Sequence, residues 1–276
     1  MRCSMKSICP LLAIPVFNEE QSLTRVLDSA RAYCRDILVI DDGSTDRTSE
    51  LLRGESRIAV ITHAENRGYG RSLADAFAHA RRHDYSWLIT MDCDEQHEPA
   101  YIPAFIAAAE EGDADVISGT RYPDGRYEAA AAPADRRAIN REITAVLARR
   151  LGLHLSDAFC GFKAYRVSAL RDVRVTVSGY AMPIEFWVQA ARHGLRIREL
   201  PVRLIYNDPN RHFGGMLDDP DIRLAHYLEV LEGALAADVP AEVAATTLQT
   251  WFEGDPVRSC PRPILGPQIP QRCWIS

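Results

Sequence analysis

Short apolar segments alternate with longer segments of helical spacing through the first part of the chain. The apolar segments cover residues 11–16, 36–40, 57–63, 86–92 and 114–122. Each of the first four is followed by a stretch that is typical of a helix. Mostly apolar strands that alternate with helices are characteristic of a parallel sheet covered on both faces. The sequence therefore predicts an α/β fold with a mainly parallel central sheet flanked by helices.

The chain after residue 122 has a different composition, with more arginines, small residues and turn formers. We expect a basic helix after the alanine-rich stretch, an apolar helix around Glu185, and two helices between residues 216 and 252. The tail over residues 254–276 carries several prolines and no periodic pattern, which indicates irregular structure. We therefore expect a single domain over residues 1–253, followed by this tail.

Charge, cysteine content and hydropathy argue against several classes of protein. The net charge of −6 and the 25% of charged residues are ordinary for a globular protein, so we expect no nucleic-acid partner. The seven cysteines include no CxxC pair, which favours a reducing compartment over a zinc site or a disulfide framework. No apolar run approaches the roughly 20 residues of a membrane-spanning helix. We expect a cytoplasmic protein with at most peripheral contact at the cytoplasmic face of a membrane.

Polar side chains follow every predicted strand of the first part of the chain. In parallel sheets the carboxyl ends of the strands share one edge, and this edge is where ligands bind. Polar clusters at several strand ends therefore predict a site there. The residues that follow the strands are Asn18, Glu19, Asp41, Asp42, Asn66, Arg67, Asp92, Asp94 and Arg121.

The segment "WLITMDCDEQHEP" ends an apolar strand in two aspartates, Asp92 and Asp94. Strand residues two positions apart share a face, so both carboxylates can point into one cavity. A hard divalent cation accepts oxygen ligands from one or two carboxylates and from phosphates and water. Together with the amide oxygen of Gln96, the pair predicts a Mg²⁺ or Mn²⁺ site that faces a diphosphate. Alternatively, the acids cap the next helix or lie in solvent.

Several motifs in order resemble one enzyme family. The segments "AIPVFNEEQSL", "ILVIDDGSTDRTSE", "NRGYGRSLADAF", "ITMDCDEQHEPAYIP" and "VISGTRY" follow one another as in the family 2 inverting glycosyltransferases, which have the GT-A fold. The segments "SDAFCGFKAYR" and "GYAMPIEFWVQAARHGLRIRELPV" are most similar to the dolichyl-phosphate mannosyltransferase and polyprenyl-phosphate glycosyltransferase branch. The resemblance covers roughly residues 10–215.

This resemblance implies a nucleotide-binding half over about residues 10–122 and an acceptor half over about residues 123–253. In the first half, it implies a donor site for a GDP- or UDP-hexose. Other roles stay open, because Phe17 could be core, Glu19 could begin a helix and Arg67 could be a solvated loop residue. The implied donor residues are Pro15, Phe17, Glu19, Asp41, Asp42, Arg67, Asp92, Asp94 and Gln96.

In the acceptor half, Arg121 and Arg136 match arginines that the lipid-phosphate branch uses around phosphate. A phosphate acceptor is already anionic at neutral pH, so it needs cations rather than a general base. Arg211 and His212 are further candidates for the substrate phosphates. Relatives usually carry a basic loop ending in Ser-Lys at this place, whereas here no lysine follows. We therefore expect metal-assisted, inverting transfer of a hexose to a polyprenyl phosphate.

Other functions remain open from the sequence. If the acceptor were a saccharide hydroxyl, Asp157 would be the candidate general base, although it could equally bond turn amides beside Gly161. Glu185, within an apolar helix, could orient an arginine or the acceptor. A sugar-1-phosphate nucleotidyltransferase should carry a glycine-rich basic loop after its first strand, and "PVFNEEQSL" lacks one. The acid pair argues against a non-catalytic nucleotide-sugar-binding protein.

Overall fold

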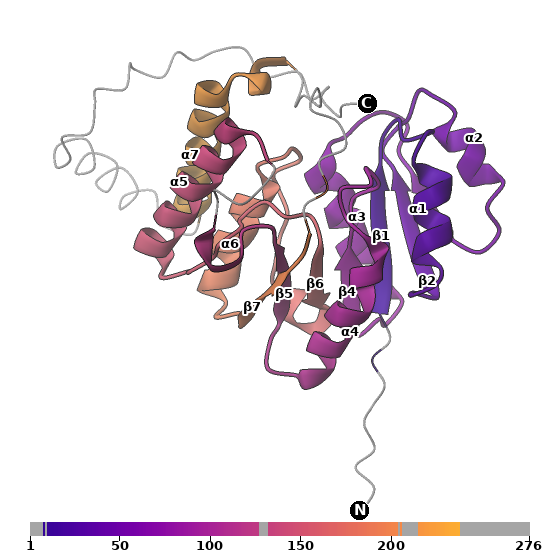
Figure 1. Cartoon of the computed structure of the whole chain (residues 1–276), viewed down its shortest axis with the longest axis horizontal. Helices are drawn as coiled ribbons and strands as arrows, with labels where there is room; N and C mark the ends of the chain where they lie inside the picture. Colours follow the sequence, from indigo (N-terminus) through magenta and orange to yellow (C-terminus); the bar gives the residue numbers. More distant parts are fainter. Residues whose placement is uncertain (1–7, 9, 127–131, 204, 206–214, 238–276) are drawn as a thin grey trace, which may run out of the picture.

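A seven-stranded sheet forms the centre of the molecule (Figure 1). The computed structural model describes residues 8, 10–126, 132–203, 205 and 215–237. The strand order is β3-β2-β1-β4-β6-β5-β7, and β6 alone runs antiparallel to its two neighbours. The strands are β1 (Pro10–Val16), β2 (Asp36–Asp41), β3 (Ala59–Thr62), β4 (Trp87–Thr90), β5 (Val116–Thr120), β6 (Lys163–Arg166) and β7 (Ile197–Pro201).

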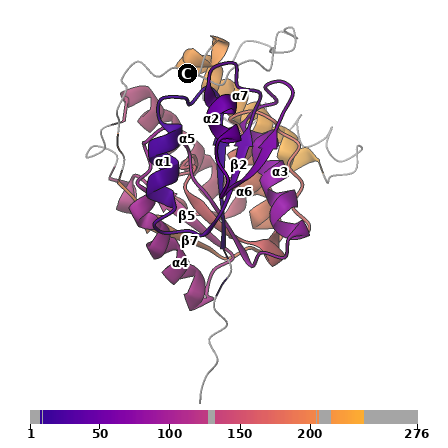
Figure 2. The same ribbon diagram turned by 90° about the vertical axis from the view of Figure 1, so that its right-hand side faces the viewer.

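Helices cover both faces of this sheet, with α1 and α3 on opposite sides of it (Figure 2). Near the other end of the sheet, α5 and α7 contact each other, and α6 packs against both (Figure 1). The helices are α1 (Leu23–Ala30), α2 (Thr48–Arg53), α3 (Tyr69–Arg82), α4 (Ile102–Glu111), α5 (Ala134–Leu151), α6 (Met182–Arg192) and α7 (Pro220–Ala236).

Alternate residues of the strands build two separate cores. In β1, Leu11 and Ala13 belong to the core on the α3 and α6 face, whereas Leu12 and Ile14 belong to the core on the α1 and α4 face. Strand residues point alternately to opposite faces, so a strand that is apolar throughout contributes to both cores. The buried apolar strands seen in the sequence therefore fix the layered architecture.

The predicted α/β fold with a mainly parallel sheet is confirmed. The antiparallel direction of β6 was not predicted, and it brings the start of this strand to the edge where the parallel strands end. Of the two helices expected between residues 216 and 252, α7 is present within the described part. The remainder of that stretch and the tail over residues 254–276 lie outside the described residues.

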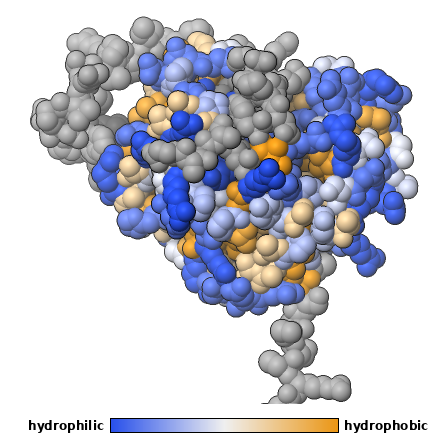
Figure 3. Space-filling model, viewed as in Figure 1, coloured by the Kyte–Doolittle hydropathy of each residue, from blue (hydrophilic) through white to orange (hydrophobic). Residues whose placement is uncertain are grey.

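The face shown in Figure 3 is largely hydrophilic, with smaller apolar patches between the polar residues. Among the described residues, no helix combines the length and the apolar character needed to cross a bilayer. Within the described residues, Cys34, Cys93 and Cys160 are all buried in the interior.

Candidate functional site

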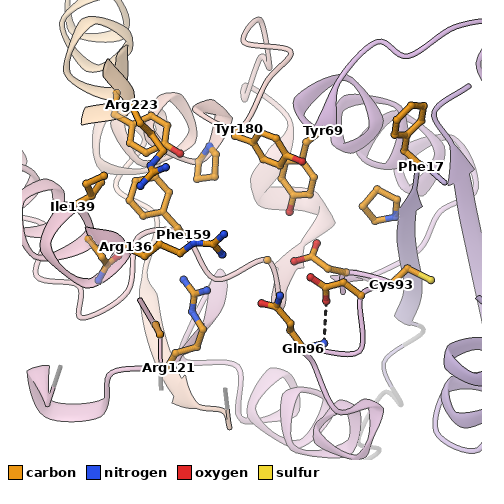
Figure 4. Close-up of a pocket in the computed structure, with 18 of the residues that line it drawn as sticks. Phe17, Tyr69, Cys93, Gln96, Arg121, Arg136, Ile139, Phe159, Tyr180 and Arg223 are labelled. Carbon is orange, nitrogen blue, oxygen red and sulfur yellow. Dashed lines mark hydrogen bonds between the residues drawn. The ribbon is translucent and has the colours of Figure 1, made fainter. Parts of the chain in front are cut away.

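A pocket opens at the edge of the sheet where β1, β4 and β5 end and β6 begins (Figure 4). It brings together eight of the residues that were predicted from the sequence. Phe17 lies toward one end of the pocket, Arg121 and Arg136 lie toward the other, and Gln96 lies between them (Figure 4). The predicted residues that line it are Pro15, Phe17, Glu19, Asp92, Asp94, Gln96, Arg121 and Arg136.

The loop after β4 holds Asp92 and Asp94 at the pocket surface. Asp94 Oδ1 accepts a hydrogen bond from the backbone N–H of Gln96 at 3.0 Å, drawn as the dashed line in Figure 4. The buried imidazole of His97 lies behind the loop, and its Nδ1 accepts from the Asp92 N–H at 3.3 Å. The loop thus fixes its own backbone and leaves the oxygens of both acids beside the cavity.

Gly161 provides the space in which the Asp92 carboxylate lies. A Cβ atom at position 161 would stand 2.3 Å from Asp92 Oδ2 and 2.7 Å from Oδ1, far inside contact distance. This glycine precedes β6, so the antiparallel strand carries it to the same edge as the end of β4. The close approach explains why a residue without a side chain stands at this position.

The donor set of this loop fits a hard divalent cation. Carboxylate oxygens from Asp92 and Asp94 and the amide of Gln96 are the ligand types that Mg²⁺ and Mn²⁺ prefer. Within the described residues, no group of three or more His, Cys, Asp or Glu side chains forms a complete cage. Two carboxylates leave coordination positions for phosphate oxygens and water, as is usual where Mg²⁺ binds a phosphorylated substrate.

Arg121 follows β5 and is held from behind by Asp157. Its Nε and Nη2 donate to the two carboxylate oxygens of Asp157 at 2.6 and 2.9 Å, and Asp157 is fully buried. Burial by itself raises the pKa of Asp157, but the Arg121 guanidinium outweighs burial and holds this pKa below its usual value. Asp157 also accepts from the N–H groups of Phe159 and Cys160. Asp157 therefore holds Arg121 in place and stabilises the turn that follows it, and it does not line the pocket.

A second acid supports this arrangement from below. Glu199 on β7 accepts hydrogen bonds from the N–H groups of Ser156 and Asp157 and from the Ser156 hydroxyl. Burial raises the pKa of Glu199 above its ordinary value, although these hydrogen bonds oppose the rise. Glu199 therefore holds the turn that carries Asp157, and Asp157 in turn holds Arg121.

Two helices supply the other cations at this end of the pocket. Arg136 projects from the first turns of α5, and Arg223 projects from α7 (Figure 4). Arg223 is 2% exposed, donates to the Leu217 carbonyl at 2.7 Å and pairs with Asp135. Three guanidinium groups therefore converge on one end of the cavity, while two aspartates lie beside its middle.

The predicted donor residues Asp41 and Asp42 do not line the pocket. Both are fully buried at the end of β2. Asp41 accepts from the Ser44 N–H at 3.0 Å and from the Ser49 hydroxyl at 2.5 Å. Asp42 accepts from the N–H groups of Arg67 and Gly68 at 2.9 and 2.8 Å and contacts His63 Nδ1 at 2.5 Å.

Three further predictions fall elsewhere. The Arg67 side chain is exposed and outside the pocket lining, and the backbone N–H of this residue is what reaches Asp42. Glu185 is buried away from the pocket lining and accepts from the N–H groups of Thr176 and Val177, so its partners are backbone rather than arginine. Arg211 and His212 lie outside the described residues.

Several lining residues were missed from the sequence. They are mostly aromatic, and apolar residues near a helix start or in a turn look like core until the elements are placed. A usable signal was their position, since each stands at a strand end, in a turn or on a helix that reaches the same edge. The missed residues include Tyr69, Tyr122, Asn140, Phe159, Tyr180, Arg223 and Tyr227.

Sequence comparison matches residues 12–174 to the family described as "Glycosyl transferase family 2". The undecaprenyl-phosphate mannosyltransferase of Micrococcus luteus is 27% identical over 228 residues, which cover 79% of this chain and 93% of that protein. The polyprenol monophosphomannose synthase of Mycolicibacterium smegmatis is 29% identical over 203 residues, which cover 70% of this chain and 76% of that protein.

Comparison with solved structures gives the same fold. Mannosyl-3-phosphoglycerate synthase from Rubrobacter xylanophilus superimposes with a TM-score of 0.62 at 14% sequence identity. The match covers 96% of this chain and 79% of that one. Identity this low shows the architecture alone, which is the GT-A glycosyltransferase fold predicted from the sequence.

Proposed function

This chain belongs to glycosyl transferase family 2 and is a glycosyltransferase, and from that premise we propose that it moves a hexose from a nucleotide-diphosphate sugar to a polyprenyl phosphate. One observation supports this most directly. A single pocket carries an acid pair suited to a metal-bound diphosphate beside its middle and arginines suited to a phosphate at one end. The relatives named for undecaprenyl phosphate and polyprenol phosphate agree with such an acceptor.

In this proposal, the donor occupies the half of the pocket built from residues 10–122. Pro15, Phe17 and Glu19 would line the base and ribose. Asp92, Asp94 and Gln96 would hold Mg²⁺ or Mn²⁺, whose chemistry is to neutralise the charge that develops on the departing diphosphate. Whether the nucleotide is GDP or UDP is decided by the assay described below.

The acceptor would enter from the half built from residues 123–253. Arg121 and Arg136 would bind its phosphate and direct one oxygen at the anomeric carbon of the hexose. A bond forms between that oxygen and the anomeric carbon as the bond to the diphosphate breaks on the opposite face. The diphosphate leaves with the electron pair, so the configuration at the anomeric carbon inverts.

The state of Asp157 favours a phosphate acceptor over a sugar hydroxyl. A hydroxyl nucleophile needs a general base near its proton, whereas a phosphate is already anionic. Asp157 was the candidate base, but its carboxylate is paired with Arg121 and its pKa lies below the usual value. An acid with a lowered pKa is a weaker base, so a hydroxyl acceptor gains no help from it.

The experiment that tests this proposal compares acceptors. Purified protein with Mg²⁺ or Mn²⁺ is given GDP-mannose, UDP-glucose or other GDP- and UDP-hexoses. Each donor is paired with undecaprenyl phosphate in detergent, or with free sugars and oligosaccharides. We expect transfer to the lipid phosphate that is abolished by chelator. Transfer to saccharide hydroxyls with none to the lipid phosphate would overturn the acceptor, and equal activity with chelator would overturn the metal.

Arg136 gives a variant matched to this assay. Arg136→Gln removes a charge-assisted contact to phosphate worth about 1.5–3 kcal/mol, so transfer should fall roughly tenfold to a hundredfold while donor binding persists. Arg141→Gln, on the exposed side of the same helix and outside the pocket lining, is the matched control. Arg121→Ala is less informative, because it also leaves the buried Asp157 carboxylate without its guanidinium.

A further inference from the structure

Two tyrosines from distant parts of the chain meet over the middle of the pocket. Tyr69 is the first residue of α3, and Tyr180 stands just before α6. Their rings are stacked, with centroids 6.3 Å apart and planes inclined by 18°. Both residues line the pocket, and in Figure 4 they lie between Phe17 at one end and Phe159 at the other, facing Gln96 across the cavity.

The pair is built by an unusually close approach of two backbone segments. The N–H of Gly70 donates to the Ser178 carbonyl at 2.6 Å. A Cβ at Gly70 would stand 2.0 Å from the Val177 oxygen, and a Cβ at Gly68 would stand 2.3 Å from the Ser178 oxygen. Only residues without side chains allow this contact, so the glycines of "NRGYG" bring the start of α3 against the segment that carries Tyr180.

Glu185 fixes the same segment from the other side. Its carboxylate accepts from the Thr176 N–H at 3.0 Å, from the Val177 N–H at 3.1 Å and from the Thr176 hydroxyl. This buried acid therefore holds the backbone that leads into Tyr180, which gives a role to a residue that otherwise lies away from the pocket. A pair held by two independent sets of contacts is a preorganised wall rather than a chance arrangement.

The order of groups along a nucleotide sugar places the hexose beside this wall. Base, ribose, diphosphate and sugar follow one another in that order. If the base lies toward Phe17 and the diphosphate lies at Asp92 and Asp94, the sugar extends toward the arginines. Tyr180 lines that path, and a tyrosine combines an apolar ring with a hydroxyl, which suits a sugar that is apolar on its faces and hydroxylated at its rim.

We propose that Tyr69 and Tyr180 form the hexose subsite of the donor pocket, with the ring of Tyr180 packing against the sugar and its hydroxyl contacting a sugar hydroxyl. This inference rests on the proposed function, since it concerns the donor of that reaction. A tyrosine hydroxyl at either position can donate to a diphosphate oxygen or a sugar hydroxyl.

The test separates the hexose from the nucleotide. Calorimetric titration with Mg²⁺ measures the affinity for GDP and GDP-mannose, and for UDP and UDP-glucose, in wild type, Tyr69→Phe, Tyr180→Phe and Tyr180→Ala. We expect the ratio of nucleotide-sugar affinity to nucleotide affinity to fall roughly two- to tenfold in Tyr180→Phe, the loss of one hydrogen bond. We expect a larger fall in Tyr180→Ala, which also loses the ring, and unchanged affinity for the free nucleotide.

Tyr33→Phe is the matched control, because Tyr33 is 40% exposed and lies outside the pocket lining. An unchanged ratio in both Tyr180 variants, or an equal loss of free nucleotide and nucleotide sugar, would overturn the hexose subsite while the proposed function stands. If wild-type protein binds neither nucleotide sugar, the proposed function fails and the inference fails with it. A melting curve for each variant separates a local change at the pocket from loss of the fold.

Discussion

Two pairs of aspartates lie at the ends of two parallel strands, but one pair is buried and the other lines the pocket. Asp41 and Asp42 follow β2 and are fully buried with partners inside the protein. Asp92 and Asp94 follow β4 and line the pocket. In the sequence the two pairs look alike, since each ends an apolar strand and opens into a turn rich in polar residues.

The difference lies in what the neighbouring segments supply. The β2 pair receives N–H groups from its own turn and from the start of α3, and a buried imidazole from the end of β3. A buried carboxylate is stable only with such partners. The β4 pair lies at the surface of a cavity, where a divalent cation can approach its carboxylate oxygens. One pair is therefore buried among its partners at the edge of the sheet, and the other lines the pocket formed at that edge.

The largest effect is expected from Asp42→Ala. It removes the acceptor for two N–H groups and leaves His63 with Asp75 as its remaining acidic contact. A buried donor left without its acceptor costs about 1–3 kcal/mol, so the free energy of unfolding in urea should fall by about that amount for each of the two N–H groups. The control is Asp113→Ala, whose side chain is 60% exposed and whose loss should change stability by less than about 0.5 kcal/mol.

The milder variant Asp42→Asn tests the other assignment of this residue. If Asp42 acts on the nucleotide, as the family resemblance implies, this variant should lose nucleotide affinity while keeping its stability. If it acts on the fold, stability should fall and the remaining folded protein should bind nucleotide normally. The first outcome would erase the contrast between the two acid pairs.

The second prediction concerns Asp94→Asn. The amide keeps the size of the side chain and can still accept from the Gln96 N–H, but it removes a charge from the ion's surroundings. We expect transfer to fall about 10²- to 10³-fold, as when one group that stabilises the transition state is lost. The melting temperature should stay the same or rise, because two neighbouring carboxylates repel each other without a cation. Full activity in this variant would refute the metal assignment.

Sequence patterns predicted the layered fold because strands that are buried on both faces of a sheet are apolar at consecutive positions. Residues 11–16 are apolar at every position, whereas a strand with one solvent-exposed face would alternate between apolar and polar residues. The direction of β6 left no such trace. An antiparallel strand can join the middle of a sheet without changing its apolar pattern, so the arrival of Gly161 beside Asp92 could be known only from the structure.

Site residues could be predicted where the residue type and its position in a motif indicate the role. They could not be predicted where the role depends on contacts between segments that are distant in the sequence. Asp94 was found because acids at a strand end suggest a cationic ligand, and Arg136 was found because it matches an arginine of the family that the sequence resembles. Asp42 carries the same signal but meets its partners within the protein, which requires knowing where β3 and α3 lie. Tyr180 was overlooked because an aromatic residue beside an apolar helix looks like core.

The third prediction tests how Asp92 is held. In Gly161→Ala the new Cβ would stand 2.3 Å from Asp92 Oδ2, so the carboxylate must turn away from its place. We expect the Mg²⁺ or Mn²⁺ concentration for half-maximal activity to rise about tenfold, the effect of disturbing a group that orients a metal ligand. Gly233→Ala in α7, where nothing lies within 4 Å, should leave this concentration unchanged. An equal response in both variants would show that Asp92 does not depend on Gly161.

The smallest effect is expected from an acid at the opposite edge of the sheet, just before β5. Asp115 accepts from Arg196 Nε at 2.9 Å and from Arg166 Nε at 3.1 Å. The hydrogen bond from Arg196 is the main cause that lowers the Asp115 pKa to about 2, and Arg166 adds to it. An unfolded aspartate titrates near pH ~3.9, so the folded protein binds this proton less readily than the unfolded chain. The stability that Asp115 contributes is therefore complete above about pH 5 and is lost as the pH falls toward about 2.

Asp115→Asn should lower the free energy of unfolding slightly near neutral pH, and the difference from wild type should shrink steadily below about pH 4. Urea unfolding of both proteins across this range measures it, and transfer activity at neutral pH should be equal because Asp115 lies outside the pocket lining. A difference in stability that stays constant down to low pH would contradict the ion pair, and a loss of activity would extend the functional edge of the sheet to the side that we assign to structure.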